Sequence, residues 1–162
     1  AGAGAFWAGS AHTAVEAEQA LHGQLLSDPL LANLPRPQAP SPTTRGYMHS
    51  LVAACAVRPY AVGAAAVLPC FWIYAEVGRA LAASAAQVLA ADPNHPYAQW
   101  VTTYDAPEFQ ESASRARELV DEAAAHAGER ERAAMATAFT VATRFELLFW
   151  DTALNPQPWP AA

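Results

Sequence analysis

Prolines divide this chain into a few long segments, and this division constrains the fold more than any other feature. They gather in three places, at residues 29–42, at residues 93–96 and from Pro156 onward. Proline has no amide donor and does not continue a helix, so each gathering predicts a loop or a helix end. The segments between them are rich in alanine, poor in β-branched residues, and show no strand pattern. We therefore predict an all-α fold.

Apolar residues recur at helical spacing within these segments. Ser41 followed by Pro42 is a typical helix start, with serine as the cap and proline in the first turn. Pro69 lies inside the third predicted helix, where we expect it to kink the helix and free the carbonyl of Ala65. The predicted helices cover residues 6–26, 41–57, 59–90, 97–126 (with a break at 105–107) and 130–154.

Length and charge limit the classes of function. With 162 residues, 53% of them hydrophobic, the chain can bury one sizeable core, and we predict a single domain over residues 1–162. The net charge is −6 and no basic stripe is interleaved with aromatics, so nucleic acid is not an expected partner. The longest apolar stretch, 60–74, is shorter than a membrane span and is followed by Glu76 and Arg79. We therefore expect no membrane partner.

Cysteine usage predicts a reduced, cytoplasmic protein. Cys55 and Cys70 form no metal or redox motif, although a disulfide between them stays open. The first residues lack the basic region of a signal peptide, so we expect no secretion. The chain also lacks a glycine-rich phosphate loop and a His-Glu-x-x-His motif, and we predict neither a metal nor an organic cofactor.

The segment Leu68–Gly78 carries an unusual set of residues for a core helix. Cys70 follows a proline inside an apolar run, and Tyr74 lies one helical turn later on the same face. Cys70 could be a nucleophile with Tyr74 beside it. Cysteine is also often a small buried hydrophobe, and from spacing alone that interpretation is favoured.

Glu146 is a single carboxylate on an otherwise largely apolar helix face. An unpaired charge there would be costly, so Glu146 must have a partner or take up a proton. A carboxyl group with a raised pKa suits general acid and base catalysis near neutral pH, and a purely structural carboxylate is equally consistent with the pattern. The stripe that it shares consists of Phe139, Ala142, Thr143, Phe149, Trp150 and Ala153.

Other polar and aromatic residues give weaker signals. Glu18 and His22 are spaced i, i+4, which fits a polar pair in or near the core better than a metal site, because no third and fourth ligand have suitable spacing. Tyr47 and Tyr104 could line a site for a flat heterocycle, or could simply pack. Residues expected in the core are Cys55, Trp72, Trp100 and Trp150.

Several segments resemble, in the same order, the TenA family, the thiaminase II enzymes of thiamin salvage. Val15–His22 resembles the Glu-and-His helix of that family, and Ser41–Tyr47 resembles the segment that brings one active-site tyrosine. Leu68–Gly78 resembles the cysteine-bearing helix. The closing motifs are matched by His95–Tyr104 and Phe145–Trp150, so the resemblance covers nearly the whole chain.

The resemblance implies a fold and an assembly. TenA proteins are helical bundles of the haem-oxygenase-like type and are usually homotetramers. They have two helices before the Glu-and-His helix, which supply an aspartate that binds the pyrimidine amino group. Nothing in this sequence corresponds to those helices. The expectation is thus an N-terminally truncated TenA-like bundle that forms a homo-oligomer.

The resemblance also implies residue roles in the hydrolysis of thiamin or of aminopyrimidine products of thiamin breakdown. Cys70 would add to the pyrimidine ring, and Glu146 would protonate a ring nitrogen and later handle the proton of water. Tyr47 and Tyr104 would hold the ring and the surroundings of the cysteine, and Phe149 would stack on the pyrimidine. Tyr74 would also contact the substrate. Protonation makes the ring electrophilic enough for a thiolate to add, so the two groups belong together chemically.

Two other functions compete with hydrolysis. One is a non-catalytic protein that binds thiamin or a pyrimidine with the same bundle. The other is a helical subunit whose exposed apolar groove binds a partner helix. The ordered set of cysteine, glutamate and tyrosine residues argues against the last of these.

Overall fold

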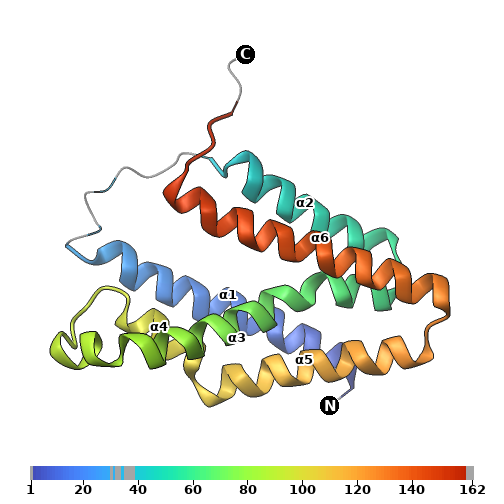
Figure 1. The fold of residues 1–162 in the computed structure, drawn as a ribbon, viewed down its shortest axis with the longest axis horizontal. Helices are drawn as coiled ribbons and strands as arrows, with labels where there is room; N and C mark the ends of the chain where they lie inside the picture. The colour runs from blue at the N-terminus through green and yellow to red at the C-terminus, as the bar shows by residue number, and fades with distance from the viewer. Residues whose placement is uncertain (1, 30, 32–33, 35–38, 160–162) are drawn as a thin grey trace. The chain divides into compact units, whose positions relative to one another are not determined.

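The computed structural model describes residues 2–29, 31, 34 and 39–159. These residues form six α-helices and no strand (Figure 1). Pro35 and Pro37, in the predicted proline-rich connection, lie outside the described residues. The helices are α1 (Ala3–Ser27), α2 (Pro42–Val57), α3 (Tyr60–Ala91), α4 (Ala98–Asp105), α5 (Pro107–His126) and α6 (Glu129–Leu154).

The predicted all-α class is confirmed, and the helix ends follow the signals in the sequence. Ser41 caps α2, because its Oγ accepts a hydrogen bond of 3.1 Å from the amide of Thr44. The break expected in the fourth segment falls at Ala106, which separates α4 from α5. Pro69 lies inside α3 with its side chain fully buried. Because proline has no amide proton, the carbonyl of Ala65 lacks its usual partner in the helix.

The chain divides into two compact units, each described here by itself. The Cys70 unit consists of residues 37–73 and 113–162, and the Tyr104 unit consists of residues 1–36 and 74–112. The Cys70 unit therefore contains α2, α6, the first part of α3 and most of α5. The Tyr104 unit contains α1, α4, the rest of α3 and the start of α5.

Within the Cys70 unit, α2 and α6 lie side by side (Figure 1). The start of α3 packs with the end of α5 and the beginning of α6 around a core of small residues and one methionine. Alanine at most of these positions lets the helix backbones approach closely. The buried members of this core are Ala61, Val62, Ala65, Ala127 and Met135.

The described end of the chain holds the beginning of α2. The indole Nε1 of Trp159 donates a hydrogen bond of 3.0 Å to the carbonyl of Pro40, and the guanidinium of Arg45 lies 5.2 Å from the centre of the Trp159 ring. Gln157 Oε1 accepts from the hydroxyl of Thr43 at 3.4 Å. Thr43 lies one helical turn before Tyr47 and is buried, so these contacts help to fix the face of α2 that carries Tyr47.

Close packing in the Tyr104 unit depends on a glycine. A Cβ atom at Gly78 would lie 2.7 Å from the carbonyl carbon and oxygen of Tyr104, so α3 and the end of α4 touch through backbone. Gln110, near the start of α5, donates from Nε2 to the carbonyls of Ala75 (3.0 Å) and Tyr104 (2.9 Å). One side chain thereby ties three helices of this unit together.

Two core predictions are wrong. Cys55 is exposed, because the covered stripe of α2 runs through the buried Thr43 and Tyr47 and the half-buried Ala54, and Cys55 lies beside that stripe. Trp150 is 37% exposed, because the turns of α6 after Glu146 face outward.

By length and composition, α3 is the one described helix that could cross a membrane. More than half of its most apolar window, 56%, is buried inside the protein. The core helix of a soluble protein has the same character, so this property is weak evidence for a membrane span.

Candidate active site

Three predicted residues meet inside the Cys70 unit, each brought by a different helix. Tyr47 comes from the buried face of α2, Cys70 from α3 directly after the buried Pro69, and Glu146 from the middle of α6. The Glu146 residue is only 2% exposed, although it carries a carboxyl group. The three side chains are distant in sequence, so the packing of α2, α3 and α6 alone brings them together.

A continuous chain of hydrogen bonds joins these side chains. The Tyr47 hydroxyl donates to Glu146 Oε1 at 2.7 Å. The oxygen of this Tyr47 hydroxyl also lies 3.1 Å from the Sγ atom of Cys70. A tyrosine hydroxyl has one proton, and Tyr47 gives it to Glu146. The thiol of Cys70 must therefore donate to the Tyr47 oxygen. The order is thiol, phenol, carboxylate, which is a path for a proton from sulfur to Glu146.

The surroundings favour the protonated form of every member. Burial raises the pKa of the Cys70 thiol to about 12, and the Glu146 carboxylate adds to this effect, whereas the hydrogen bond with Tyr47 opposes it. Burial raises the pKa of Glu146, and its interactions with Tyr47 and Cys70 lower it only in part. Burial also raises the pKa of Tyr47, with further contributions from Cys70 and Glu146.

These shifts define what the three groups can do chemically. At neutral pH the thiol is protonated in the free protein and is a weak nucleophile. It becomes a thiolate only if its proton is taken up nearby at the moment of reaction. Glu146, a buried carboxyl with a raised pKa, is suited to hold that proton and to deliver it elsewhere.

Two phenylalanines of α6, one on each side of Glu146 in sequence, differ in their surroundings. The ring of Phe145 stacks on Tyr47, with 5.4 Å between ring centres and 8° between planes. Sequence reasoning gave Phe145 no such role, and only the side-by-side placement of α2 and α6 reveals it. Phe149, predicted to stack on a pyrimidine, is 38% exposed, so part of its ring is accessible.

The other predicted tyrosines lie in the Tyr104 unit and form a cluster there. Tyr74 and Tyr104 have ring centres 5.0 Å apart, and Trp100 lies 4.6 Å from Tyr104. The Tyr104 hydroxyl donates to Glu18 Oε1 at 2.5 Å. No spacing rule predicts this bond, because 86 positions separate the two residues.

The predicted pairing of Glu18 with His22 is present, with 3.7 Å between carboxylate oxygen and His22 Nε2. Its predicted place in or near the core is wrong for the histidine, whose side chain is 64% exposed. The imidazole points outward because α1 buries mainly the face that carries Leu21. In the part of the chain that the structure describes, no group of three or more histidine, cysteine, aspartate or glutamate residues could hold a metal ion.

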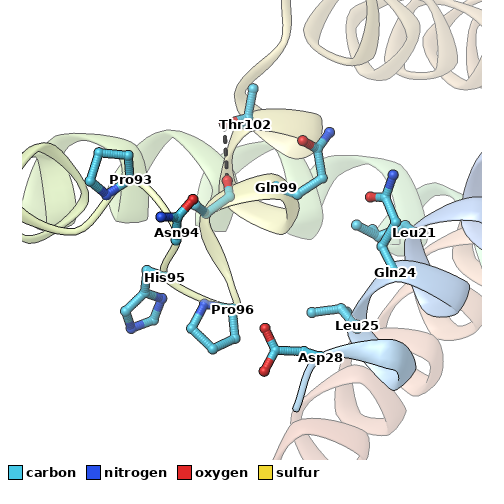
Figure 2. Close-up of a pocket in the computed structure, with 11 residues that line it drawn as sticks. Leu21, Gln24, Leu25, Asp28, Pro93, Asn94, His95, Pro96, Gln99 and Thr102 are labelled. Atoms are coloured by element: carbon cyan, nitrogen blue, oxygen red, sulfur yellow. Dashed lines mark hydrogen bonds between the residues drawn. The ribbon is translucent and has the colours of Figure 1, made fainter. Parts of the chain in front are cut away.

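An open pocket in the Tyr104 unit encloses about 330 Å³ between the end of α1 and residues 93–102. Figure 2 shows Leu25 of α1 and Asp28, which directly follows α1, on one side, and Asn94, His95 and Pro96 on another. None of the six predicted site residues lines it. The pocket therefore does not account for the chemistry predicted from the sequence.

Comparison with known proteins identifies the family of this chain. The profile of the TENA/THI-4/PQQC family matches residues 31–156, which is most of the chain. This chain belongs to the TENA/THI-4/PQQC family. The predicted TenA resemblance and the helical fold that it implies are thereby confirmed.

Two relatives show how this family member compares with longer proteins. The chain is 37% identical over 153 residues to a thiamine biosynthesis multifunctional protein, ThiED, of Corynebacterium efficiens, and covers 94% of itself and 20% of that protein. It is 32% identical over 146 residues to an aminopyrimidine aminohydrolase of Bacillus subtilis, and covers 89% of itself and 59% of that enzyme. It thus spans about a fifth of the first relative and less than two thirds of the second.

Proposed function

We propose that this TENA/THI-4/PQQC family member hydrolyses aminopyrimidines of thiamin metabolism by cysteine catalysis. The substrate would be 4-amino-5-aminomethyl-2-methylpyrimidine, or thiamin itself, and the product would be hydroxymethylpyrimidine. The observation that carries the proposal is the hydrogen-bonded chain from Cys70 through Tyr47 to the buried Glu146. The aminopyrimidine aminohydrolase among its relatives supports the choice of substrate class.

The reaction would begin with proton transfer along this chain. The thiol proton of Cys70 passes to the Tyr47 oxygen while the Tyr47 proton passes to Glu146, which leaves a thiolate and a carboxylic acid. The thiolate adds to a ring carbon as Glu146 protonates a ring nitrogen, and the carboxyl returns to its ionised form. A ring without that proton would be a poor electrophile, so the two events support each other.

The remaining steps replace the amine by water. Electrons of the adduct expel ammonia from the aminomethyl carbon, and the carbon–nitrogen bond breaks. Water adds to the same carbon, and its proton goes to Glu146. Glu146 passes this proton to the released ammonia. The carbon–sulfur bond then breaks as the ring nitrogen returns its proton to Glu146, and from there the proton reaches sulfur through Tyr47. Overall, a protonated aminomethyl group and water give a hydroxymethyl group and ammonium.

Other predicted contacts stay predictions. We propose that Phe149, with part of its ring accessible, stacks on the pyrimidine. The substrate roles predicted for Tyr74 and Tyr104, the homotetramer and the cytoplasmic location likewise remain to be tested. A non-catalytic pyrimidine binder is the second candidate, and the high pKa of the Cys70 thiol is the observation that favours it.

The test is a hydrolysis assay with a matched pair of cysteine variants. Purified protein is incubated with 4-amino-5-aminomethyl-2-methylpyrimidine, and separately with thiamin, while hydroxymethylpyrimidine is measured. Cys70→Ala should abolish turnover, whereas Cys55→Ala, which removes the exposed thiol, should keep it. Turnover by Cys70→Ala would exclude the cysteine mechanism. Ligand-induced stabilisation of the wild type without product would support the binder instead.

A further inference from the structure

Thr143 on α6 differs from the other threonines of its helix. Thr137 and Thr140 each donate to the backbone carbonyl four residues earlier, at 2.9 Å and 2.8 Å, and Thr152 donates to the carbonyl of Phe149 at 2.6 Å. These are the usual partners of a helical threonine. The hydroxyl oxygen of Thr143 is buried and has no hydrogen-bond partner among the described residues.

A second buried oxygen without a partner lies on the same face of α6. Glu146 Oε1 accepts from Tyr47, but Oε2 is buried and makes no hydrogen bond within the described part of the chain. Glu146 follows Thr143 by three positions, so the two side chains project from one face in successive turns. Buried polar atoms in proteins nearly always have a partner, and an exception calls for an explanation. Two such oxygens, one helical turn apart, call for a shared explanation.

We propose that the Thr143 hydroxyl and Glu146 Oε2 together hold the water that attacks in the hydrolysis proposed above, on which this inference rests. A water molecule both donates and accepts hydrogen bonds, and needs two or more polar partners to be held at a buried site. A hydroxyl can donate and accept, and a carboxylate accepts, so the pair can fix the water with one hydrogen directed at Oε2. Thr143 touches the attacking water and is in that sense catalytic.

The water step balances with these groups and the released ammonia. The water oxygen forms a bond to the exocyclic carbon that has lost ammonia, and one water proton passes to Glu146 Oε2. The electron pair accepted by the ring then returns to sulfur as the bond between Cys70 and the ring breaks. Glu146 passes the water proton to the released ammonia and takes back the proton that it gave to the ring nitrogen. That proton then travels through Tyr47 to the thiolate.

This assignment separates Thr143 from the first half of the reaction. Adduct formation and loss of ammonia need Cys70, Tyr47 and Glu146, but they consume no water. Loss of the hydroxyl should therefore slow only the second half. It should also leave the fold intact, because the hydroxyl bonds no other group of the described residues and valine has nearly the same shape as threonine.

The experiment compares first-turnover ammonia with hydroxymethylpyrimidine formation, using 4-amino-5-aminomethyl-2-methylpyrimidine as the substrate. Thr143→Val removes the hydroxyl at nearly constant shape, and Thr143→Ser keeps it. Thr140→Val is the matched control, since that exposed hydroxyl bonds only its own helix. Melting temperatures are measured for all variants, and Thr143→Val is expected not to melt below the wild type.

Expected for Thr143→Val are an ammonia burst within about threefold of the wild-type rate, and hydroxymethylpyrimidine formation about 10- to 100-fold slower, on the scale of one positioned catalytic group. A covalent adduct on Cys70 should accumulate and be visible by intact mass. Thr143→Ser and Thr140→Val should behave like the wild type.

Equal slowing of ammonia and product with a raised KM would place Thr143 against the substrate, and unchanged kinetics would make it structural. Either result overturns the inference while the proposed function stands, and a wild type without ammonia or product overturns both.

Discussion

Each unit contains a tyrosine hydroxyl that donates to a glutamate, yet the two pairs differ in almost everything around them. Tyr47 and Glu146 lie 2.7 Å apart with the carboxyl-bearing residue 2% exposed, and the third partner is a thiol. Tyr104 and Glu18 lie 2.5 Å apart, but the Glu18 side chain is 40% exposed and its third partner is a histidine.

The comparison shows that the hydrogen bond itself does not make a carboxyl catalytic. A hydrogen bond from tyrosine lowers the pKa of Glu146, and the net pKa is raised because burial outweighs it. Water can still reach Glu18, which therefore keeps part of its hydration. The buried pair is suited to exchange protons with a substrate, and the exposed pair is suited to anchor Tyr104 on α1.

The largest expected difference between the pairs is in catalysis. Glu146→Gln should lower kcat/KM for aminopyrimidine hydrolysis by about 10²–10⁴, the usual contribution of general acid–base catalysis. Glu18→Gln keeps an oxygen that can accept from Tyr104, and should change kcat/KM by less than about tenfold, because an exposed pair contributes little. The two variants are compared in one assay. Similar losses in both would show that burial does not distinguish the pairs.

The two cysteines of the Cys70 unit, Cys70 and Cys55, should differ in their rates of alkylation. With a pKa of about 12, roughly one Cys70 in 10⁴ is a thiolate at pH 8, so iodoacetamide should modify exposed Cys55 at least about 100-fold faster. Glu146→Gln removes a charge that raises the thiol pKa, and should speed the alkylation of Cys70 while it slows hydrolysis. Peptide mass mapping over time measures both rates. Equal rates for the two cysteines would contradict the raised pKa.

Close packing should make the Tyr104 unit the less tolerant of an added methyl group. Gly78→Ala would place a Cβ 2.7 Å from the backbone of Tyr104 and should cost about 1–3 kcal/mol in urea unfolding. At Gly46, the Cβ would lie 3.3 Å from an atom of the movable Phe145 ring, and the gain in helix propensity should roughly cancel the contact. Gly23→Ala is the control, with nothing within 4 Å, and should stabilise the protein by up to about 1 kcal/mol. A neutral Gly78→Ala would contradict the described packing.

The pH dependence of stability tests the raised pKa of Glu146 separately from activity. The folded state binds this proton more tightly than the unfolded state, whose carboxyl has its ordinary pKa near 4.5. The stabilisation is complete below that pH and is lost as the pH rises through the folded-state pKa, by about 1.4 kcal/mol for each unit between the two values. Glu146→Gln cannot titrate at this position. Its free energy of unfolding should therefore rise relative to that of the wild type between pH 4 and pH 8. A constant difference would show that Glu146 is not perturbed.

The sequence was enough to predict the helices and to single out the three residues that the structure brings together in the Cys70 unit. Proline positions and the Ser41 cap are local signals, and they placed the helix ends within a few residues. Glu146 was expected to need a partner or a proton, because a charge on an apolar stripe is costly in any fold. The resemblance to TenA placed Tyr47 near the cysteine, and the structure adds that one hydroxyl contacts both Cys70 and Glu146.

What the sequence could not predict depends on which helix faces are covered. Cys55 and Trp150 have the composition of core residues, but each lies on a part of its helix that is left open. The bond between Tyr104 and Glu18 joins helices that are far apart in sequence, so no spacing rule indicates it. Thr143 shares the stripe of Glu146 in the sequence. Only the structure shows that its hydroxyl, unlike those of the other threonines of α6, has no partner among the described residues.

In the proposed mechanism, the proton moves between Cys70 and Glu146 through Tyr47. A double-mutant cycle on kcat/KM for aminopyrimidine hydrolysis, with Tyr47→Phe, Glu146→Gln and the double variant, measures this directly. If Tyr47 acts only by passing protons to and from Glu146, its loss should matter little once Glu146 is replaced, and the double variant should be about as slow as Glu146→Gln alone. If the loss in the double variant equals the product of the two single losses, the residues act independently, and the path through Tyr47 is contradicted.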